Sequence, residues 1–252
     1  ISVGNITTGG VGKTPVVAEI AKYFLSKGEK IAIVSRGYGG KLPNKNINVI
    51  SDGKKIYYDA QMAGDEPFWL ANNTSLKSSP NSGEITVVDE LAIHTNAGEV
   101  IKSGAIVITS KNRYEAAKYA IDKFKVTRII LDDGFQHRKL YRDLDIVLVD
   151  SEKGFGREKV LPSGPMREGQ EAFKRIDKLV IVSKNTDHSR AEKLAKIMGK
   201  KMNVPTFVCK TEPDIVYNIK TGDILKKGSS ATAICAIGQP EQFYAFLNDY
   251  DI

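Results

Sequence analysis

The stretch TTGGVGKT, residues 7–14, constrains the fold of this chain more than any other part of its sequence. It stands between a short apolar strand pattern, ISVGNI at residues 1–6, and the segment PVVAEIAKYFLSK, which has apolar residues at helical spacing. A glycine-rich loop between a strand and a helix presents backbone N–H groups and the positive end of the helix dipole to an anion. The pattern therefore predicts a phosphate-binding loop at the first turn of an α/β fold.

Continuous apolar runs further along the chain indicate buried strands. They are IAIVSR, AIVIT, RIILDD, DIVLVD, KLVIVSK and ATAICAI, and helical patterns occur in NRYEAAKYAIDKFK, SRAEKLAKIMGK and PEQFYAFLND. IAIVSR completes a βαβ unit with the first strand and helix, which favours a mostly parallel sheet with helices on both faces. INVISDGKKIYYDA and IVYNIKTGDIL predict small β-hairpins. We expect an α/β fold of the P-loop NTPase-like class.

The 252 residues suit a single P-loop core that spans residues 1–252. Residues 75–104 interrupt it, because they are polar and rich in turn residues and separate a predicted helix from a strand that could follow directly. We interpret this stretch as an inserted surface excursion. No apolar run reaches the roughly 20 residues that a membrane-spanning helix needs. Since the chain begins at Ile1 on a strand, we expect a fragment whose native start lies upstream.

The net charge of +7 is the main feature of the composition. A basic excess suits nucleic acid, an anionic membrane surface or a phosphorylated substrate, and lysine-rich solvated faces give the same count. The two cysteines, Cys209 and Cys235, lie in apolar runs without CxxC spacing. Buried thiols in a reducing compartment are therefore expected, and neither a disulfide nor a metal site.

Within the loop, Lys13 is predicted to reach the β- and γ-phosphates and Thr14 to offer its hydroxyl to Mg²⁺, as GK[ST] after a strand implies. Thr7 departs from the pattern, because GxxxxGK[ST] begins with glycine. GGVGKT also ends the loop of partition-type ATPases, whose signature lysine would fall at Thr8. A partition-type nucleotide switch thus stays an alternative. VSKNTD at 182–187 mis-spaces the aspartate of a guanine-reading motif, so guanine specificity is not expected.

RIILDDGFQH, residues 128–137, is an apolar strand that ends in acidic residues. Carboxylates at the carboxyl end of such a strand face the Mg²⁺ held by the phosphate loop, so Asp132 and Asp133 are the candidates. The alternative is a strand that ends in an ordinary Asp-Gly turn. His137 is either a site residue or a turn histidine.

AGDEPFWLAN, residues 63–72, begins a helix with Asp65 at the expected N-cap, Glu66 and Pro67 in the first turn, and the apolar residues 68–70 packing behind. Asp65 either caps the helix or, aimed into a phosphate site, orients or deprotonates a hydroxyl nucleophile. The residue types alone do not separate these roles.

SRGYGG at 35–40 and LPSGPMRE at 161–168 each place an arginine in a loop bounded by glycine or proline. A guanidinium group binds phosphate with two parallel hydrogen bonds, and loops at the carboxyl ends of strands are where α/β sheets bind ligands. Each loop alone could be a surface turn. Beside a phosphate loop, the two together favour a binding rim.

The motifs VGNITTGGVGKTPVV, VSRGYGG, GDEP, DDGFQH with a following RD, GFGR and LPSGPMRE, in this order, resemble the tetraacyldisaccharide 4'-kinase family of lipid A biosynthesis. The resemblance covers nearly the whole chain apart from residues 75–104. It implies an ATP- and Mg²⁺-dependent P-loop kinase that phosphorylates the 4'-hydroxyl of a tetraacylated glucosamine disaccharide 1-phosphate. It also implies a location at the cytoplasmic face of the bacterial inner membrane.

The resemblance assigns roles to particular residues. Asp65 matches the proposed catalytic base of the family, and Arg113 in SKNRYEAA matches a charged position that lines the site. The implied catalytic residues are Asp65, Lys13, Asp133, His137, Arg113, Arg167 and Glu168; the ATP-binding residues are Thr7, Thr8, Gly9, Gly10, Val11, Gly12, Lys13 and Thr14; and the Mg²⁺ ligands are Thr14 and Asp132.

Two departures from the family pattern stand out. The family usually joins the GDEP helix to the next strand without the roughly 30 extra residues of this chain, a length beyond ordinary connections. Its members also continue past AICAIGQPEQFYAFL to a histidine motif that tunes the aspartate base, a place that none of His94, His137 and His188 occupies. An inactive remnant of the kinase that still binds ATP is therefore a further alternative.

The resemblance also defines the expected partners. They are a lipid-linked disaccharide substrate and an anionic inner-membrane surface, without nucleic acid, and the protein is expected to be a monomer. The N-terminal hydrophobic anchor typical of the family is not part of this sequence. Membrane association would then depend on basic and apolar surface near the substrate loops.

Overall fold

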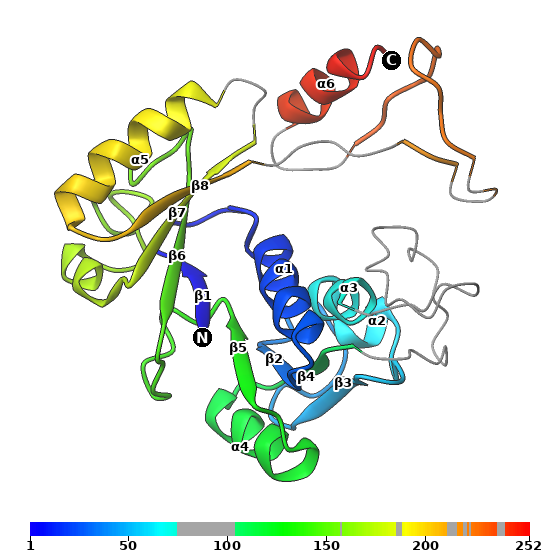
Figure 1. Cartoon of the computed structure of the whole chain (residues 1–252), viewed down its shortest axis with the longest axis vertical. Coiled ribbons are helices and arrows are strands. Elements are labelled where there is room, and N and C mark those ends of the chain that lie inside the picture. The colour runs from blue at the N-terminus through cyan, green and yellow to red at the C-terminus, as the bar shows by residue number, and fades with distance from the viewer. Residues whose placement is uncertain are drawn as a thin grey trace. The chain divides into compact units, whose positions relative to one another are not determined.

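The computed structural model describes residues 1–74, 104–156, 158–184, 188–210, 216–218, 221, 223–235 and 240–252. Contacts divide the chain into two compact units (Figure 1). Unit 1 consists of Ile1–Asn5 and Gly12–Ile146, and unit 2 of Ile6–Val11 and Val147–Ile252. The chain thus leaves unit 1 and returns to it within the glycine-rich loop. Apart from Gly104, the predicted excursion at 75–104 lies outside the described residues.

In the described part of unit 1, five strands form a sheet in the order β3-β4-β2-β5-β1. They are β1 (Ser2–Asn5), β2 (Ile31–Ser35), β3 (Asn48–Asp52), β4 (Ile106–Thr109) and β5 (Arg128–Asp132). β1, β5, β2 and β4 are parallel, and only the edge strand β3 runs antiparallel. The apolar runs that predict these parallel strands are buried on both faces, as expected for a sheet covered by helices. All four parallel strands therefore end at the same edge.

Helices cover both faces of this sheet. α1 (Lys13–Ser26) packs on β1, β2 and β5 and contacts α3 (Asp65–Asn73), which follows the short α2 (Ala60–Ala63). α4 (Arg113–Phe124) packs on β2 and β4, and Figure 1 shows it on the face opposite α1 and α3. Ala116 and Ala120 let α4 approach these strands closely. The prediction of a P-loop NTPase-like α/β fold with a mostly parallel sheet is confirmed.

The ends of α1 follow from the residue types that the sequence places there. Pro15 lies in the first turn, where a missing N–H costs nothing. Gly28 follows the last turn with φ 77°, and its N–H bonds to the Leu25 carbonyl at 2.9 Å. A left-handed glycine after the C-cap is the usual helix stop.

Unit 2 contains the strands in the order β6-β7-β8. They are β6 (Asp145–Asp150), of which Val147–Asp150 belong to this unit, β7 (Lys178–Ser183) and β8 (Thr206–Lys210). β7 and β8 are parallel, and α5 (Ser189–Met202) packs on both. The 3-10 helix η1 (Gln170–Arg175) and α6 (Pro240–Asp249) complete the described elements. None of the described helices combines the length and apolar character that crossing a membrane requires.

Some local predictions differ from the structure. The predicted strand ATAICAI has no strand at its described residues 231–235, where Ile234 is 86% exposed, because an apolar run becomes a buried strand only where a neighbour pairs with it. β3 pairs mainly with β4, and its predicted hairpin return is a single bridge from Ser51 to Ile56. Cys209 and Cys235 are half-buried, although burial was expected, and neither forms a disulfide in the described part of the chain.

Candidate active site

The phosphate loop needs its glycines at two positions. Gly9 has φ 109° and Gly12 has φ 79°, conformations that other residues rarely adopt. Gly12 is also the N-cap of α1 and supplies no side-chain hydrogen bond to the first turn. The first N–H groups of a helix have no partner within the helix, so those of α1 are available to an anion.

The lysine of the loop lies beside the end of the acidic strand. Lys13 Nζ donates a hydrogen bond to Asn5 Oδ1 at 3.1 Å and lies 3.5 Å from Asp133 Oδ1. Asn5 is the last residue of β1, and Asp133 directly follows β5, which is parallel to β1 and pairs with it. Two motifs more than 100 residues apart in the sequence therefore meet at the carboxyl edge of unit 1.

Asp132 is a buried carboxylate, only 2% exposed. Ser35 Oγ at the end of β2 donates a hydrogen bond to its Oδ2 at 3.2 Å. Burial raises the pKa of Asp132 to about 6, and the Glu66 carboxylate adds to this, while Lys13 opposes it. Near neutral pH the group is therefore close to its titration, and a bound divalent cation would favour the ionised form.

Asp133 has a strained backbone, with φ 51° in the left-handed region. Its carbonyl accepts a hydrogen bond from Arg113 Nη1 at 2.7 Å. Arg113 is the first residue of α4 and is 4% exposed. Burial lowers the pKa of Arg113, and the Asp133 and Asp132 carboxylates oppose this. Strain of this kind persists where surrounding contacts hold it, and it is common at functional sites.

The turn that carries Asp65 is packed against the SRGYGG loop. A Cβ at Gly40 would lie 2.6 Å from the Met62 carbonyl oxygen, and one at Gly64 would lie 2.4 Å from the Tyr38 carbonyl oxygen. Leu42 N–H also bonds to the Met62 carbonyl at 3.1 Å. The two glycines thus allow the two loops to touch backbone to backbone.

Asp65 is not the N-cap that the sequence predicts. Gly64, with φ 93°, holds that place, and Asp65 is the first helical residue of α3, exposed and without a side-chain capping bond. Capping was predicted because an acidic residue precedes Pro67, but the sharp backbone turn at the cap requires glycine. Trp69, expected to pack behind the turn, is 39% exposed. The Asp65 carboxylate is therefore not used by the helix and lies at the positive end of its dipole.

Arg36 in the SRGYGG loop is oriented by its neighbour Tyr38. Its Nη1 donates to the Tyr38 hydroxyl at 2.6 Å, and the guanidinium lies over the ring at 5.0 Å from its centroid. Both side chains are exposed. The loop follows β2, so this guanidinium lies at the same edge of unit 1 as Ser35 and Asp132.

In unit 2, the LPSGPMRE loop runs beside the first half of the phosphate loop. Thr8 N–H bonds to the Pro165 carbonyl at 2.8 Å, Arg167 N–H bonds to the Ile6 carbonyl at 2.6 Å, and Thr7 and Met166 form an antiparallel bridge. Arg167 is half-buried. Glu168 forms an ion pair with Arg175, so its predicted role at the site competes with this pairing. Arg157 of the GFGR motif and residues 185–187 of VSKNTD lie outside the described residues.

Two lysines that the sequence analysis does not predict as site residues lie beside the first half of the phosphate loop. Lys184 Nζ donates to the Gly10 carbonyl at 2.5 Å and lies 3.3 Å from Asp150 Oδ2. Lys153 Nζ would lie 3.8 Å from a Cβ at Gly9. Their positions in the sequence could have indicated such a role, because Asp150 is the last residue of β6 and Lys184 directly follows β7, and ligands bind at the carboxyl ends of such strands. Asn5 and Ser35 carry the same signal in unit 1.

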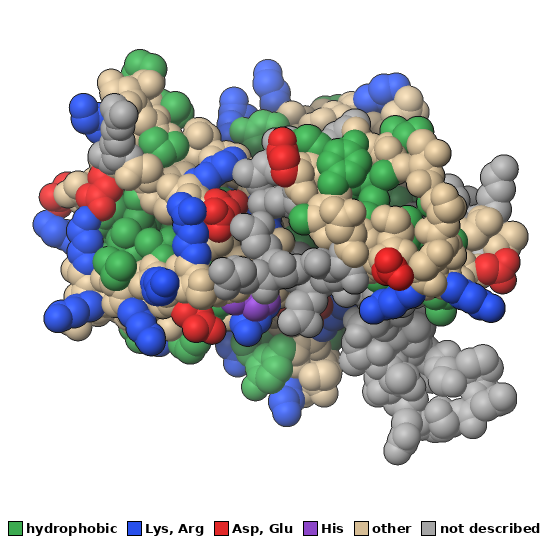
Figure 2. Space-filling model, turned by 90° about the horizontal axis from the view of Figure 1, so that it is seen from above, with side chains coloured by type: hydrophobic (Ala, Val, Ile, Leu, Met, Phe, Trp, Pro, Cys, Tyr) green, Lys and Arg blue, Asp and Glu red, His purple; other side chains and the backbone are tan. Residues whose placement is uncertain are grey.

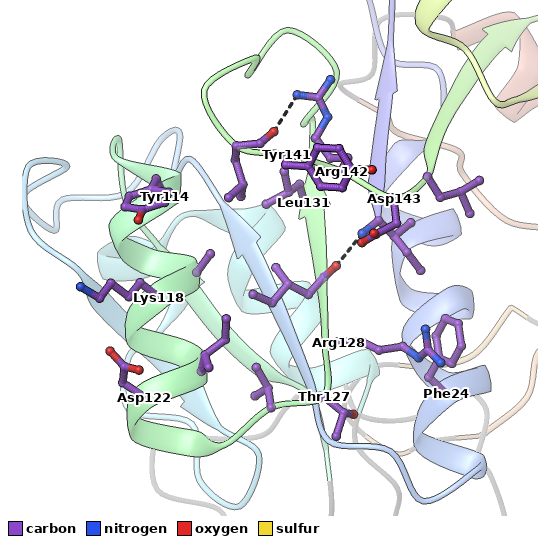
Figure 3. A pocket seen from close by; sticks show the side chains of 17 residues that line it. Phe24, Tyr114, Lys118, Asp122, Thr127, Arg128, Leu131, Tyr141, Arg142 and Asp143 are labelled. Carbon is purple, nitrogen blue, oxygen red and sulfur yellow. Dashed lines mark hydrogen bonds between the residues drawn. The ribbon is translucent and has the colours of Figure 1, made fainter.

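Two hollows occur among the described residues of unit 1 and bear on the site. The larger, about 790 Å³, runs along α4 to the amino ends of the strands, where Ile1, Phe24 and Arg128 line it (Figure 3). Neither Lys13 nor the strand-end acids line it, so it is not the candidate site. The smaller, about 670 Å³, lies at the carboxyl edge and is lined by Lys45, Lys111, Asn112, Tyr114, His137 and Lys139.

The fold and the convergence of a glycine-rich loop, its lysine and two strand-end acids define a P-loop NTPase-like protein. The sequence profile of the LpxK family, described as tetraacyldisaccharide-1-P 4'-kinase, matches residues 1–81 and 99–252. The chain belongs to this family. The profile leaves residues 82–98 unmatched, and they lie within the predicted excursion.

Curated relatives and a solved structure agree with this membership. The chain is 37% identical to the tetraacyldisaccharide 4'-kinase of Desulfotalea psychrophila, over 97% of this chain and 63% of the relative. It is 34% identical to that of Halothermothrix orenii, over 98% of this chain and 61% of the relative. The chain thus spans less than two thirds of the length of these relatives.

The fold is similar to a crystal structure of LpxK from Aquifex aeolicus in complex with ATP. The TM-score is 0.53 at 24% sequence identity, over 83% of this chain and 70% of that one. At this identity the likeness supports the fold of the chain.

The raised pKa of Asp132 predicts how stability depends on pH. An unfolded aspartate titrates near 3.8 and the native one near 6, so between these values the native state holds the extra proton. The free energy of unfolding should therefore fall as the pH rises from about 4 to about 6. Above about pH 6 the contribution of Asp132 to this free energy should become constant. Asp132→Asn should remove this loss. At pH 7.5 its free energy of unfolding should exceed that of the parent by up to about 3 kcal/mol.

Urea denaturation of both proteins without nucleotide, at several pH values from 4 to 8, measures this difference. Asp122→Asn, an exposed position on α4, is the control. Parallel stability profiles of the parent and Asp132→Asn would contradict the assignment.

The contact between the two loops predicts a steric cost at Gly40. In Gly40→Ala the new methyl group would meet backbone atoms of Met62 and Ala63 at 2.6 Å. Neither can move without the turn before Asp65, so we expect a loss of about 1–3 kcal/mol in the free energy of unfolding. Gly169→Ala is the matched control, since a Cβ there meets nothing within 4 Å. Equal melting temperatures for the two variants would show that the loops are not packed in this way.

Proposed function

We propose that this chain is the kinase core that transfers the γ-phosphate of ATP to the 4'-hydroxyl of a tetraacylated glucosamine disaccharide 1-phosphate. The chain belongs to this family, and one observation supports the proposal most directly. The loop lysine, Lys13, lies 3.5 Å from the carboxylate of Asp133 at the end of β5. Loop, lysine and acids at one edge of a sheet are the recurring parts of phosphoryl-transfer sites. The ATP complex of the Aquifex aeolicus protein supports the choice of nucleotide.

The residues present fit an ATP–Mg²⁺ complex. Mg²⁺ is usually bound by one or two carboxylates, with phosphate oxygens and water as its other ligands. No group of three or more His, Cys, Asp or Glu side chains suited to a metal occurs among the described residues, and this arrangement does not need one. Asp132, buried with a raised pKa, and the Thr14 hydroxyl would hold the ion. When bound, Mg²⁺ neutralises charge on the β- and γ-phosphates.

The protein's own groups orient and stabilise the transferred phosphoryl group. Asn5 and Asp133 hold the Lys13 ammonium at the start of α1, where the phosphates are expected. Arg113 fixes the backbone of Asp133 through its carbonyl. Groups that such contacts hold in place stabilise developing charge without reorganisation, and this lowers the barrier.

Asp65 is the proposed general base. Its carboxylate is exposed, forms no capping bond, and lies at the N-terminus of α3. A loose transition state for phosphoryl transfer asks little of the base, so Asp65 takes the hydroxyl proton late. Positioning of the acceptor then contributes most of the rate.

The proposed setting is the cytoplasmic face of the bacterial inner membrane, with a monomer acting on a lipid-linked acceptor. The net charge of +7 supports attraction to anionic lipid. In Figure 2, Lys and Arg side chains are spread over the visible face with Asp and Glu between them. The proposed attraction to anionic lipid therefore depends on the overall charge.

Transfer of radiolabel from [γ-³²P]ATP to the disaccharide acceptor, measured with the full-length protein, tests the proposed function. Asp65→Asn should lower kcat by a factor of about 10²–10⁴ with little change in the KM for ATP, because the base acts on the acceptor. Lys13→Met should also raise the KM for ATP, since it removes a phosphate contact. Asp122→Asn on the surface of α4 should match the parent.

Other outcomes would favour the alternatives. Nucleotide-dependent dimerisation with slow ATP hydrolysis and no labelled lipid would support a partition-type switch. ATP binding with neither hydrolysis nor transfer would identify an inactive remnant.

A further inference from the structure

We propose that Lys184 is a positioning residue for the nucleotide phosphates and acts through the backbone of the phosphate loop. It directly follows β7, and its ammonium group holds the Gly10 carbonyl in the orientation that turns the Val11 N–H toward a bound phosphate. The inference rests on the proposed function, in particular on ATP binding, and adds a residue to which the sequence analysis assigns no role.

The contact lies within unit 2, which contains both Lys184 and residues 6–11 of the phosphate loop. Lys184 Nζ donates a hydrogen bond to the Gly10 carbonyl at 2.5 Å. The lysine side chain is 20% exposed, so the contact is largely shielded from water. A hydrogen bond from a charged donor is shorter and stronger than one between neutral groups. This contact is therefore well suited to fixing a peptide group.

The ammonium group of Lys184 is itself located by Asp150, the last residue of β6. Asp150 is 2% exposed, and its Oδ1 accepts hydrogen bonds from Glu152 N–H at 2.9 Å and from Lys153 N–H at 3.3 Å. Its Oδ2 lies 3.3 Å from Lys184 Nζ. Because its own turn fixes the carboxylate, the carboxylate in turn fixes the ammonium group beside the loop.

The peptide group between Gly10 and Val11 needs such a contact. Glycine rotates about its backbone bonds with little steric penalty. A Cβ at Gly10 would meet nothing within 4 Å, so packing does not restrict this residue. Val11 is 2% exposed, and burial of its side chain does not decide which way the preceding peptide group faces. The bond from Lys184 supplies that choice.

The orientation of this peptide group decides whether it attracts or repels an anion. In a trans peptide the carbonyl and the following N–H point in opposite directions. With the Gly10 carbonyl on the ammonium group, the Val11 N–H points away from Lys184 and is free to donate to a phosphate oxygen. In the flipped peptide the carbonyl oxygen would take that place and repel the phosphate. Concave rows of backbone N–H groups bind anions only when successive groups face the same side.

Few other donors are available in this half of the loop. Thr8 N–H already bonds to the Pro165 carbonyl at 2.8 Å. The N–H groups of Gly9, Gly10 and Val11 remain, and none of them forms a hydrogen bond within the described part of the chain. Loss of one donor out of three should therefore weaken phosphate binding measurably.

Direct contact between the Lys184 ammonium and a phosphate is the competing explanation, and Asp150 distinguishes the two. If Lys184 bound phosphate directly, the Asp150 carboxylate would oppose binding by competing for the lysine and by repelling the anion. If Lys184 acts through Gly10, the carboxylate supports binding because it holds the lysine in place. Removal of the Asp150 charge thus has opposite signs in the two cases.

Lys184→Met tests the inference in the full-length protein, through the dissociation constants of Mg²⁺–ADP and Mg²⁺–pyrophosphate measured by calorimetric titration. We expect both constants to rise by about 10–100-fold, because one hydrogen bond to a charged ligand is lost. The two factors should be equal, since pyrophosphate has the phosphates without the base. Asp150→Asn keeps the Oδ1 acceptor of its turn and should also weaken both ligands. Lys196→Met, at an exposed position of α5, should match the parent.

Three results would overturn the inference. They are unchanged constants in Lys184→Met, a change for ADP alone, which would assign the lysine to the base, and tighter binding by Asp150→Asn, which would indicate direct contact with phosphate. A melting curve verifies that each variant is folded. If Lys184→Met is not, the sign of the effect in Asp150→Asn decides.

The radiolabel assay separates failure of this inference from failure of the proposed function. A loop contact that is present both before and during transfer affects binding alone, so Lys184→Met should raise the KM for ATP and leave kcat within about threefold of the parent. A parent that transfers no phosphate, with ADP and pyrophosphate binding weakened as expected in the variants, would refute the kinase and leave the role of Lys184 standing. Transfer by the parent with an unchanged KM for ATP in Lys184→Met would overturn only the role of Lys184.

Discussion

The contact between the Lys13 ammonium and the Asp133 carboxylate, at 3.5 Å, is the constraint on which the site depends. It exists because β1 and β5 are parallel neighbours, so the loop after one and the turn after the other leave the sheet at the same edge. The side chains are 13% and 26% exposed, partly shielded from water, which strengthens their attraction. Ser35, Arg113 and Asn5 then complete a polar cluster whose members lie in or next to five different elements of unit 1, namely β1, α1, β2, α4 and β5.

Much of this architecture could be predicted because burial on both faces leaves a strong signal. The continuous apolar runs of β2, β4 and β5 and the periodic apolar residues of α1 and α4 each specify an element by themselves. The order of strands does not follow from such runs, since it depends on which edges meet. The run at 231–235 shows the limit, because the same composition forms no strand where no neighbour pairs with it.

Some residues of the candidate site could likewise be predicted from the sequence, and others could not. The position of Lys13 beside the acids at the end of β5 could be predicted, because both motifs are local and follow strands of one parallel sheet. Asn5, Ser35 and Lys184 were missed, since a polar residue at the end of a strand has no meaning until its neighbours are known. Asp65 was predicted correctly to lie at a helix start, but the N-cap is Gly64. The need for glycine at this position follows only from the close packing of two loops, which the sequence does not show.

That fit also has a mechanical consequence. Because no side chain separates them, the backbones at Gly40 and Gly64 are in direct contact, and neither loop can move without displacing the other. The stacked pair of Arg36 and Tyr38 and the carboxylate of Asp65 are thus carried by one stiff piece of the surface. A sequence change that reshapes the SRGYGG loop would also shift the turn that carries Asp65, so the positions of Arg36 and of the Asp65 carboxylate cannot change independently.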